Sequence, residues 1–277
     1  MVLGLLAAIG FGTGDFCGGR ASVRGSTNAV LLVSQLTAAA GALVLVVVVE
    51  GTARTGDLAW GIGAGVATAA GLGLLYHGLG QGRVAVVAPL AALMGSIVPV
   101  VYGLVNGERP GGLVLLGIVG AVVAAVLISR EPATADDGGH PLRWSVVIGL
   151  VAGTFLGSSL VCFAHTHADS GLWAVLSARV VAALVAGLSM AATRDRVALP
   201  PRSRGLAAGA GLFDVGGTAL VVIGLRRSLA SVIGPIASLA PGFTVLWAIA
   251  VLREPIARVQ AAGLALALVS LVLIAAG

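Results

Sequence analysis

The sequence predicts an all-α integral membrane protein in which ten transmembrane helices form two inverted five-helix repeats around a central cavity. Three observations lead to this prediction. The 277 residues are 58% hydrophobic and only 10% charged, whereas a soluble domain carries about 25% charged residues. Apolar stretches of about 20 residues, each long enough to cross the hydrocarbon core, recur from one end of the chain to the other. The two halves also share motifs at a nearly constant spacing.

Ten apolar segments follow one another along the chain. They cover about 2–19, 28–49, 58–80, 84–106, 111–129, 144–164, 171–192, 205–226, 230–252 and 257–276. Most connections between them are tight turns, and neither of the two longer ones, 130–143 and 193–204, has room for a soluble domain. We therefore expect a first five-helix repeat over 1–130, a flexible linker over 131–143 and a second repeat over 144–277.

Several motifs of the first half recur in the second. Pro89, Glu108 and Gly78 reappear 146 residues later as Pro235, Glu254 and Gly224, and Gly4 and Gly12 reappear 145 residues later as Gly149 and Gly157. An odd number of spans per repeat means that the second repeat enters the membrane from the opposite side. The repeats are then inverted, an arrangement that suits alternating access to a central site.

Composition narrows the classes of partner and cofactor. The 42 glycines allow membrane helices to pack closely or to line a cavity. All 16 basic residues are arginines, which we interpret mainly as anchors at the lipid headgroups. No basic stretch carries the interleaved aromatic residues of a nucleic-acid binding face, so we expect no nucleic-acid partner. Cys17 and Cys162 lie in apolar runs and are interpreted as buried thiols.

Charged residues inside membrane helices are costly and are usually kept for a pathway, a pair or a relay. Asp15, Arg179 and Asp214 are the candidates, and Gln35 is the counterpart of Arg179 in the first repeat. Two readings stay open. An Arg179–carboxylate pair could simply hold helices together, or the charges could bind a substrate or take up a proton in the cavity.

Further cavity candidates are aromatic and hydroxyl side chains. They are Tyr76, Ser96, Tyr102, Ser238, Thr244 and Trp247, and the candidate hinges are Pro89, Pro99, Pro235 and Pro241, whose rings remove helix hydrogen bonds. Glu108 and Glu254 are expected to cap or pair at helix ends. His165, His167 and Asp169 form the only cluster that resembles metal ligands, but its spacing is loose, so we expect neither a metal nor another cofactor.

The chain resembles EamA-type members of the drug/metabolite transporter superfamily. The marks are Gly12-Thr13-Gly14-Asp15-Phe16 in the first segment, Tyr76-His77-Gly78-Leu79 in the third, and the fourth and ninth segments ending in Gly-Glu-Arg and Arg-Glu-Pro. The resemblance implies that the first four helices of each repeat surround the cavity and that the fifth packs outside. It also implies transport of small metabolites or amphipathic drugs. The chain departs from the family pattern at Asp15 and Gln35, where members often have Asn and Arg.

We therefore predict a multi-pass protein of the cytoplasmic membrane that acts as a secondary transporter, by proton coupling or by exchange. The expected partners are a small-molecule substrate and the lipid bilayer, and a homodimer is compatible with the sequence. The alternatives are a non-transporting scaffold and a membrane-embedded enzyme, although no H-E-x-x-H or G-x-S-x-G motif favours the enzyme. The positive-inside rule places both termini outside, whereas the resemblance implies both inside.

Overall fold

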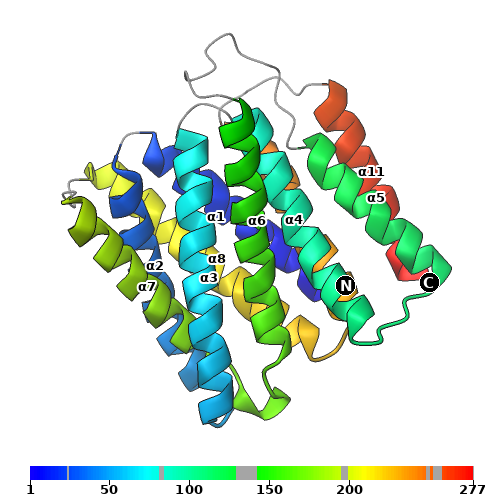
Figure 1. The fold of residues 1–277 in the computed structure, drawn as a ribbon, viewed down its shortest axis with the longest axis horizontal. Helices are drawn as coiled ribbons and strands as arrows, with labels where there is room; N and C mark the ends of the chain where they lie inside the picture. The colour runs from blue at the N-terminus through cyan, green and yellow to red at the C-terminus, as the bar shows by residue number, and fades with distance from the viewer. Residues whose placement is uncertain are drawn as a thin grey trace.

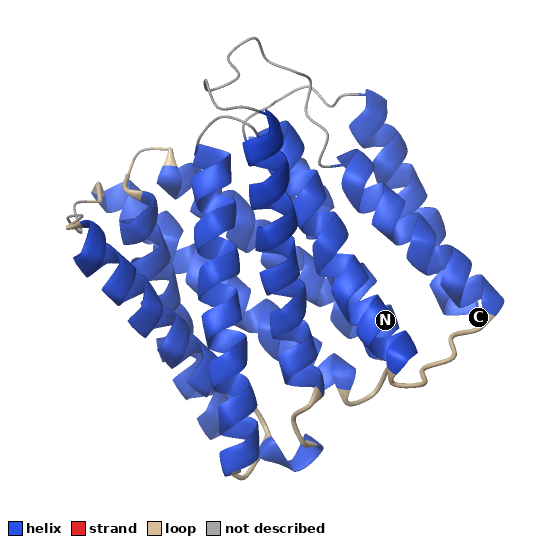
Figure 2. Cartoon of the chain, viewed as in Figure 1, coloured by secondary structure: helices blue, strands red, loops and turns tan. Residues whose placement is uncertain are grey.

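The computed structural model describes residues 1–23, 25–80, 84–128, 142–194, 199–247, 250–251 and 258–276. Every described element in these ranges is helical, and none of them is a strand (Figure 2). This agrees with the predicted all-helical class. The predicted linker lies almost entirely outside the described residues, because only Leu142 and Arg143 at its end belong to a described helix.

Helices lie within all ten predicted apolar segments. The first half contains α1 (Val2–Ser22), α2 (Thr27–Val48), α3 (Thr55–Gly80), α4 (Val84–Val105) and α5 (Gly112–Ile128). The second contains α6 (Leu142–Ala164), the short 3₁₀ helix η1 (Ala168–Ser170), α7 (Trp173–Thr193), α8 (Pro201–Leu225), α9 (Ala230–Ala237), α10 (Ala240–Trp247) and α11 (Arg258–Ala276). Among the described residues, six helices are long and apolar enough to cross a membrane, namely α1, α2, α3, α6, α7 and α8.

The helices pack in pairs that join the two halves of the chain. α1 lies along α8 and α10, α3 lies along α6 and α7, α2 lies along α7 and α8, and α4 lies along α6 and α9. α5 and α11 pack against each other at one side of the bundle (Figure 1). The start of α1 and the end of α11 lie toward the same end of the bundle, which we call the terminus-side end. The opposite end is called the Arg-rich end, since its connections carry most of the arginines.

Glycines allow these pairs to approach closely, and equivalent glycines make equivalent contacts in the two halves. A Cβ on Gly71 of α3 would lie 2.8 Å from the side chain of Leu156 in α6, and a Cβ on Gly217 of α8 would lie 2.8 Å from that of Phe11 in α1. Gly71 and Gly217 are 146 residues apart, and Phe11 and Leu156 are 145 apart. Equivalent glycines therefore occupy equivalent helix crossings in the two halves.

A second pair of crossings repeats in the same way. A Cβ on Gly149 of α6 would lie 2.9 Å from Leu90 of α4, and a Cβ on Gly4 of α1 would lie 3.0 Å from Ile236 of α9. Leu90 and Ile236 again differ by 146 residues. Small residues at helix interfaces are the usual means of close packing in membranes, where lipid tails are as apolar as the side chains.

The ninth apolar segment is not one continuous helix. α4 runs unbroken through the positions of Pro89 and Pro99, whereas α9 ends at Ala237, two residues after Pro235. Pro241, at the start of α10, has no backbone N–H with which to bond the carbonyl of Ala237, and the chain turns at Ser238 and Leu239. The side chains of Pro89 and Pro241 lie outside what the structure describes, and the hinge roles stay predictions.

Candidate functional site

A buried ion pair connects α7 and α8 in the interior of the bundle. Nη1 of Arg179 donates to Oδ2 of Asp214 over 2.5 Å, and the two side chains are 3% and 21% exposed. Arg179 lies on the α7 face that carries the buried alanines Ala178, Ala182 and Ala186, whose small side chains leave room for a guanidinium. Both residues were predicted from sequence as intramembrane charges, and the structure brings them into direct contact.

Two neutral side chains complete the surroundings of Arg179. Nη1 also donates to Oε1 of Gln35 in α2 over 3.4 Å, and Nη2 donates to the hydroxyl of Thr218 in α8. The Thr218 hydroxyl donates in turn to the carbonyl of Asp214 over 2.9 Å. We call Gln35, Arg179, Asp214 and Thr218 the charge cluster. Nε of Arg179 is buried and has no partner among the described residues.

Thr218 is a member of the cluster that was not predicted, although the sequence contains a signal for it. It follows Asp214 by four residues, so both side chains project from the same face of α8. A polar residue one turn after an intramembrane carboxylate is therefore a candidate member of the same site.

Asp15 and Tyr76 lie beside the charge cluster. The Asp15 carboxylate is within electrostatic range of Asp214, and the Tyr76 hydroxyl is within range of both carboxylates and of Arg179. Tyr76 is buried in α3 directly under Gly18 of α1, where a Cβ would lie 2.8 Å from its hydroxyl oxygen. The structure thus gathers Asp15, Tyr76, Arg179 and Asp214 from four different helices.

Two other predicted residues belong to a contact between α1 and α10. Nε1 of Trp247 donates to the hydroxyl of Thr13 over 2.9 Å, and the Thr244 hydroxyl donates to the carbonyl of Gly12 over 3.0 Å. A Cβ on Gly12 would collide with the carbonyl oxygen of Ala240. These hydrogen bonds hold helices together and do not reach the charge cluster.

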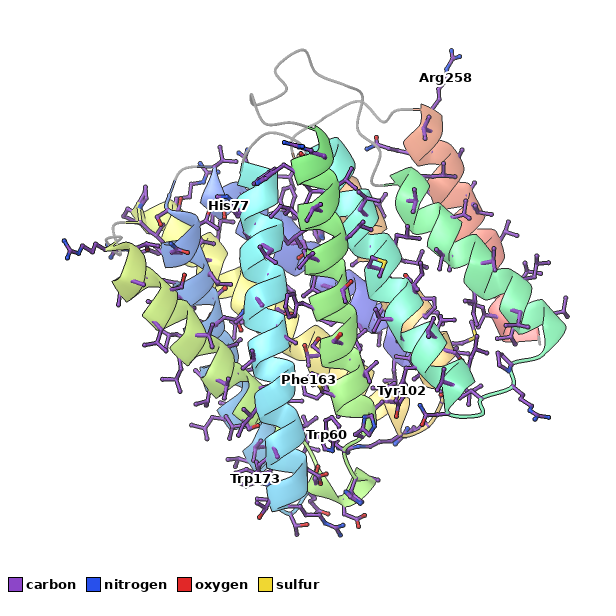
Figure 3. All side chains as sticks on the ribbon, in the orientation of Figure 1. Trp60, His77, Tyr102, Phe163, Trp173 and Arg258 are labelled. Atoms are coloured by element: carbon purple, nitrogen blue, oxygen red, sulfur yellow. The ribbon has the colours of Figure 1, made fainter. Side chains whose placement is uncertain are left out.

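The remaining predicted residues are dispersed. Ser96 is fully buried and donates to the carbonyl of Ala92 in its own helix, and Ser238 lies at the end of α9. Tyr102 lies near the terminus-side end, with its ring centre 5.1 Å from that of His165 (Figure 3). His165 also stacks on Trp60 at 4.1 Å. Tyr102 is therefore part of an aromatic group at a helix end.

The loops at the terminus-side end form a second polar network. The buried carboxylate Asp57 accepts from the backbone N–H of His167 over 3.2 Å and contacts its Nδ1 at 3.0 Å. Arg54 pairs with Asp169 at 3.0 Å, and Arg226 donates to the carbonyl of Gly171. Burial lowers the pKa of the Arg226 guanidinium below its ordinary value, and the nearby carboxylates of Asp57 and Asp169 oppose this shift. The network joins the α2–α3, α6–α7 and α8–α9 connections.

The two histidines of the predicted metal-like cluster therefore have different partners. His165 stacks with aromatic rings, whereas His167 contacts Asp57. Within the described residues, no group of three His, Cys, Asp or Glu side chains converges in a way that could hold a metal ion.

A cleft of about 590 Å³ lies between the ends of α2, α3 and α7 at the Arg-rich end. Its polar lining residues are Thr27, Asn28, His77, Ser189 and Thr193. His77 is labelled near that end in Figure 3. None of the ten predicted cavity residues lines this cleft.

The helices from α6 to α11 carry a family signature. The model of the EamA-like transporter family matches residues 143–276. This is a family of the drug/metabolite transporter superfamily, so the predicted resemblance is confirmed over these residues. With the EamA region and the apolar helices together, the chain is a multi-pass membrane protein.

Comparison with individual solved structures gives the fold alone. No curated protein matches the sequence at a significant level. Among 26 matching chains of solved structures, one, described only as the crystal structure of a protein, superposes with a TM-score of 0.76 at 14% identity. The match covers 99% of this chain and 95% of that one. The likeness therefore extends over the region that precedes the EamA match as well as over the match itself.

Proposed function

We propose that the protein is a secondary transporter of the cytoplasmic membrane that moves a small metabolite or an amphipathic solute by alternating access. In this proposal, ten spans form two inverted five-helix repeats, 1–130 and 144–277, and the charge cluster lies at the centre of the solute path. Inverted-repeat transporters bind their solutes near the bilayer midplane, at the interface of the repeats.

The repeated helix contacts support the two-repeat architecture. The crossing of α3 with α6 uses Gly71 as the crossing of α8 with α1 uses Gly217. The crossing of α6 with α4 uses Gly149 as the crossing of α1 with α9 uses Gly4. A pseudo-twofold axis in the membrane plane would relate each member of these pairs to the other, and it would exchange the two repeats.

The observation that carries the proposal is the buried charge cluster, which draws its residues from both halves. Gln35 comes from the first half, and Arg179, Asp214 and Thr218 come from the second. A charge at the centre of a membrane helix costs about 2.5–3.5 kcal/mol on insertion scales, so charges placed there usually serve a pathway or a partner. A cluster held between two halves that can rock would be exposed first to one side and then to the other.

The balance of charges favours coupling to a proton or to a cationic group. The guanidinium of Arg179 is paired with Asp214, while the second carboxylate, Asp15, lies within electrostatic range of that pair. When all three groups are ionised, the negative charges outnumber the positive one. A proton or the ammonium group of a solute would restore neutrality in a low-dielectric site, where an uncompensated charge is costly.

The two rival functions make different demands on the chain. A scaffold requires no charged cluster between its halves, and an enzyme requires a nucleophile with its base or a metal centre. The four residues of the charge cluster include no serine or cysteine nucleophile, and among the described residues no group of three His, Cys, Asp or Glu side chains could hold a metal ion. Transport therefore accounts for the costly buried charges better than either rival.

Uptake into proteoliposomes tests the proposal. Vesicles holding the purified protein would be given labelled amino acids, nucleosides and fluorescent amphipathic cations, with and without an imposed pH gradient. We expect at least one probe to accumulate in a protein-dependent manner, and we expect the variant Asp214→Asn with Arg179→Gln to lose that uptake while remaining folded. Equal uptake by this double variant and the unaltered protein would refute the role of the cluster.

A further inference from the structure

The helix α9 begins without a cap of its own. Its N-cap residue is Leu229, whose apolar side chain accepts no hydrogen bond, so the first backbone N–H groups of the helix need another acceptor. Glu108 of the α4–α5 connection supplies it. Its Oε1 accepts from the N–H of Ala230 over 2.9 Å, and its Oε2 accepts from the N–H of Ser231 over 3.0 Å.

This contact joins segments 122 and 123 residues apart. From the sequence, Glu108 is expected to cap or pair at a helix end. The helix that Glu108 caps lies in the other half of the chain. A carboxylate at a helix N-terminus also interacts favourably with the helix dipole, and its hydrogen bonds are of the stronger, charge-assisted kind.

The end of α4 is shaped to deliver this carboxylate. The N–H of Glu108 bonds the carbonyl of Gly103 over 2.9 Å, and the N–H of Gly107 bonds that of Leu104 over 3.1 Å. Gly107 has a φ of 87°, so the turn is a Schellman motif with a left-handed glycine. A Cβ on Gly103 would collide with Oε2 of Glu108. Glycine at both positions thus allows the turn and makes room for the carboxylate.

The Glu108 cap lies at one end of a longer contact between α4 and α9. A Cβ on Gly234 of α9 would lie 2.9 Å from Cβ of Pro99 in α4. All eight residues of α9 are buried. Within the described residues, α4 makes no comparable contact with α10, which continues the same segment toward the Arg-rich end. Among the described residues, the two segments therefore pack against each other mainly along α9, the half of the ninth segment that begins at the terminus-side end.

We propose that the Glu108 cap is a latch that holds the α4–α9 junction closed at the terminus-side end and so determines which end of the solute path is open. The latch rests on the proposed alternating access. Its release lets α9 move away from α4, opens the path at the terminus-side end and closes the cleft at the Arg-rich end. Glu108 acts as a positioning residue, because it touches α9 and not the charge cluster.

Thiol labelling in lipid nanodiscs tests the latch without any knowledge of the solute or of the membrane orientation. Cys17 and Cys162 are first replaced by serine. A reporter cysteine is then placed at Ser231, which is fully buried at the latch, or at Ser189, which lines the cleft at the Arg-rich end. The rate of reaction with a bulky, charged maleimide is measured for each reporter.

The two reporters should respond in opposite directions to Glu108→Ala. Loss of a helix cap corresponds to a shift in an equilibrium of about fivefold to thirtyfold. We expect labelling at position 231 to rise by about this factor and labelling at 189 to fall. Glu108→Gln, which keeps one acceptor oxygen, should give a smaller change of the same sign. The matched control Glu50→Gln removes an exposed carboxylate at the same end and should change neither rate.

Two results would overturn the latch. A rise at 231 with no change at 189 means that α9 merely frays, and unchanged rates at both positions mean that the cap does not govern opening. The test separates this failure from failure of the proposed function. If uptake depends on the charge cluster while the labelling rates do not respond to Glu108→Ala, the proposed transport function is supported and the latch is refuted. If the two labelling rates change in opposite directions but no probe is taken up, the latch is supported and the proposed transport function is not.

Discussion

The Arg179–Asp214 pair offers a quantitative test of the charge cluster through Arg179→Gln, Asp214→Asn and the double variant. Removing one partner of a buried ion pair destabilises a protein by about 3–5 kcal/mol, since the other charge is left uncompensated. Arg179 is almost fully buried and Asp214 keeps some exposure. We therefore expect Asp214→Asn, which strands the guanidinium, to fall toward the upper part of that range and Arg179→Gln toward the lower part.

The double variant has no stranded charge. It loses hydrogen bonds to Thr218 and Gln35, which corresponds to about 1–3 kcal/mol. If the two sites were independent, the single costs would add to about 6–10 kcal/mol. The free energy of unfolding, measured by denaturing-detergent titration of the three variants, gives the coupling between the residues. Additive costs would show that the pair does not interact as the structure indicates.

Uptake by the same variants separates structure from function. If the pair only holds α7 and α8 together, the double variant should fold and should transport at the unaltered rate. If the cluster belongs to the solute path, the double variant should fold and yet transport poorly. Normal uptake in a well-folded double variant would return both residues to a purely structural role.

Three further predictions follow from the helix contacts and the topology. Gly12→Ala should lower the free energy of unfolding by about 1–3 kcal/mol, because its Cβ meets the backbone of α10. Gly19→Ala in the same helix, where a Cβ has nothing within 4 Å, should not lower it. The detergent titration compares the two variants, and equal destabilisation would contradict the close crossing of α1 with α10. Trp247→Phe should cost about 0.5–1.5 kcal/mol through its lost hydrogen bond to Thr13, and an unchanged value would show that this bond is not made in the membrane. Reporter fusions at the two termini should give same-side signals; opposite-side signals would refute ten spans.

The helices and the buried charges follow from the sequence because both depend on local chemistry in a low-dielectric solvent. A stretch of about 20 apolar residues satisfies its backbone only as a helix in lipid. An arginine or aspartate inside such a stretch requires a partner, so the sequence alone identifies Arg179 and Asp214 as candidates for the site. Thr218 could also be predicted from the sequence, because residues four apart, such as Asp214 and Thr218, project from the same face of a helix.

Tertiary packing decided which of the other polar residues meet. Tyr102 and Thr244 carry groups suited to a cavity, yet one lies beside His165 at a helix end and the other bonds the backbone of α1. Glu108 was expected at a helix end, but its partner is the start of α9, more than a hundred residues away. No local pattern encodes such a partner, because the helix that needs a cap and the carboxylate that supplies it are brought together only when α4 packs against α9.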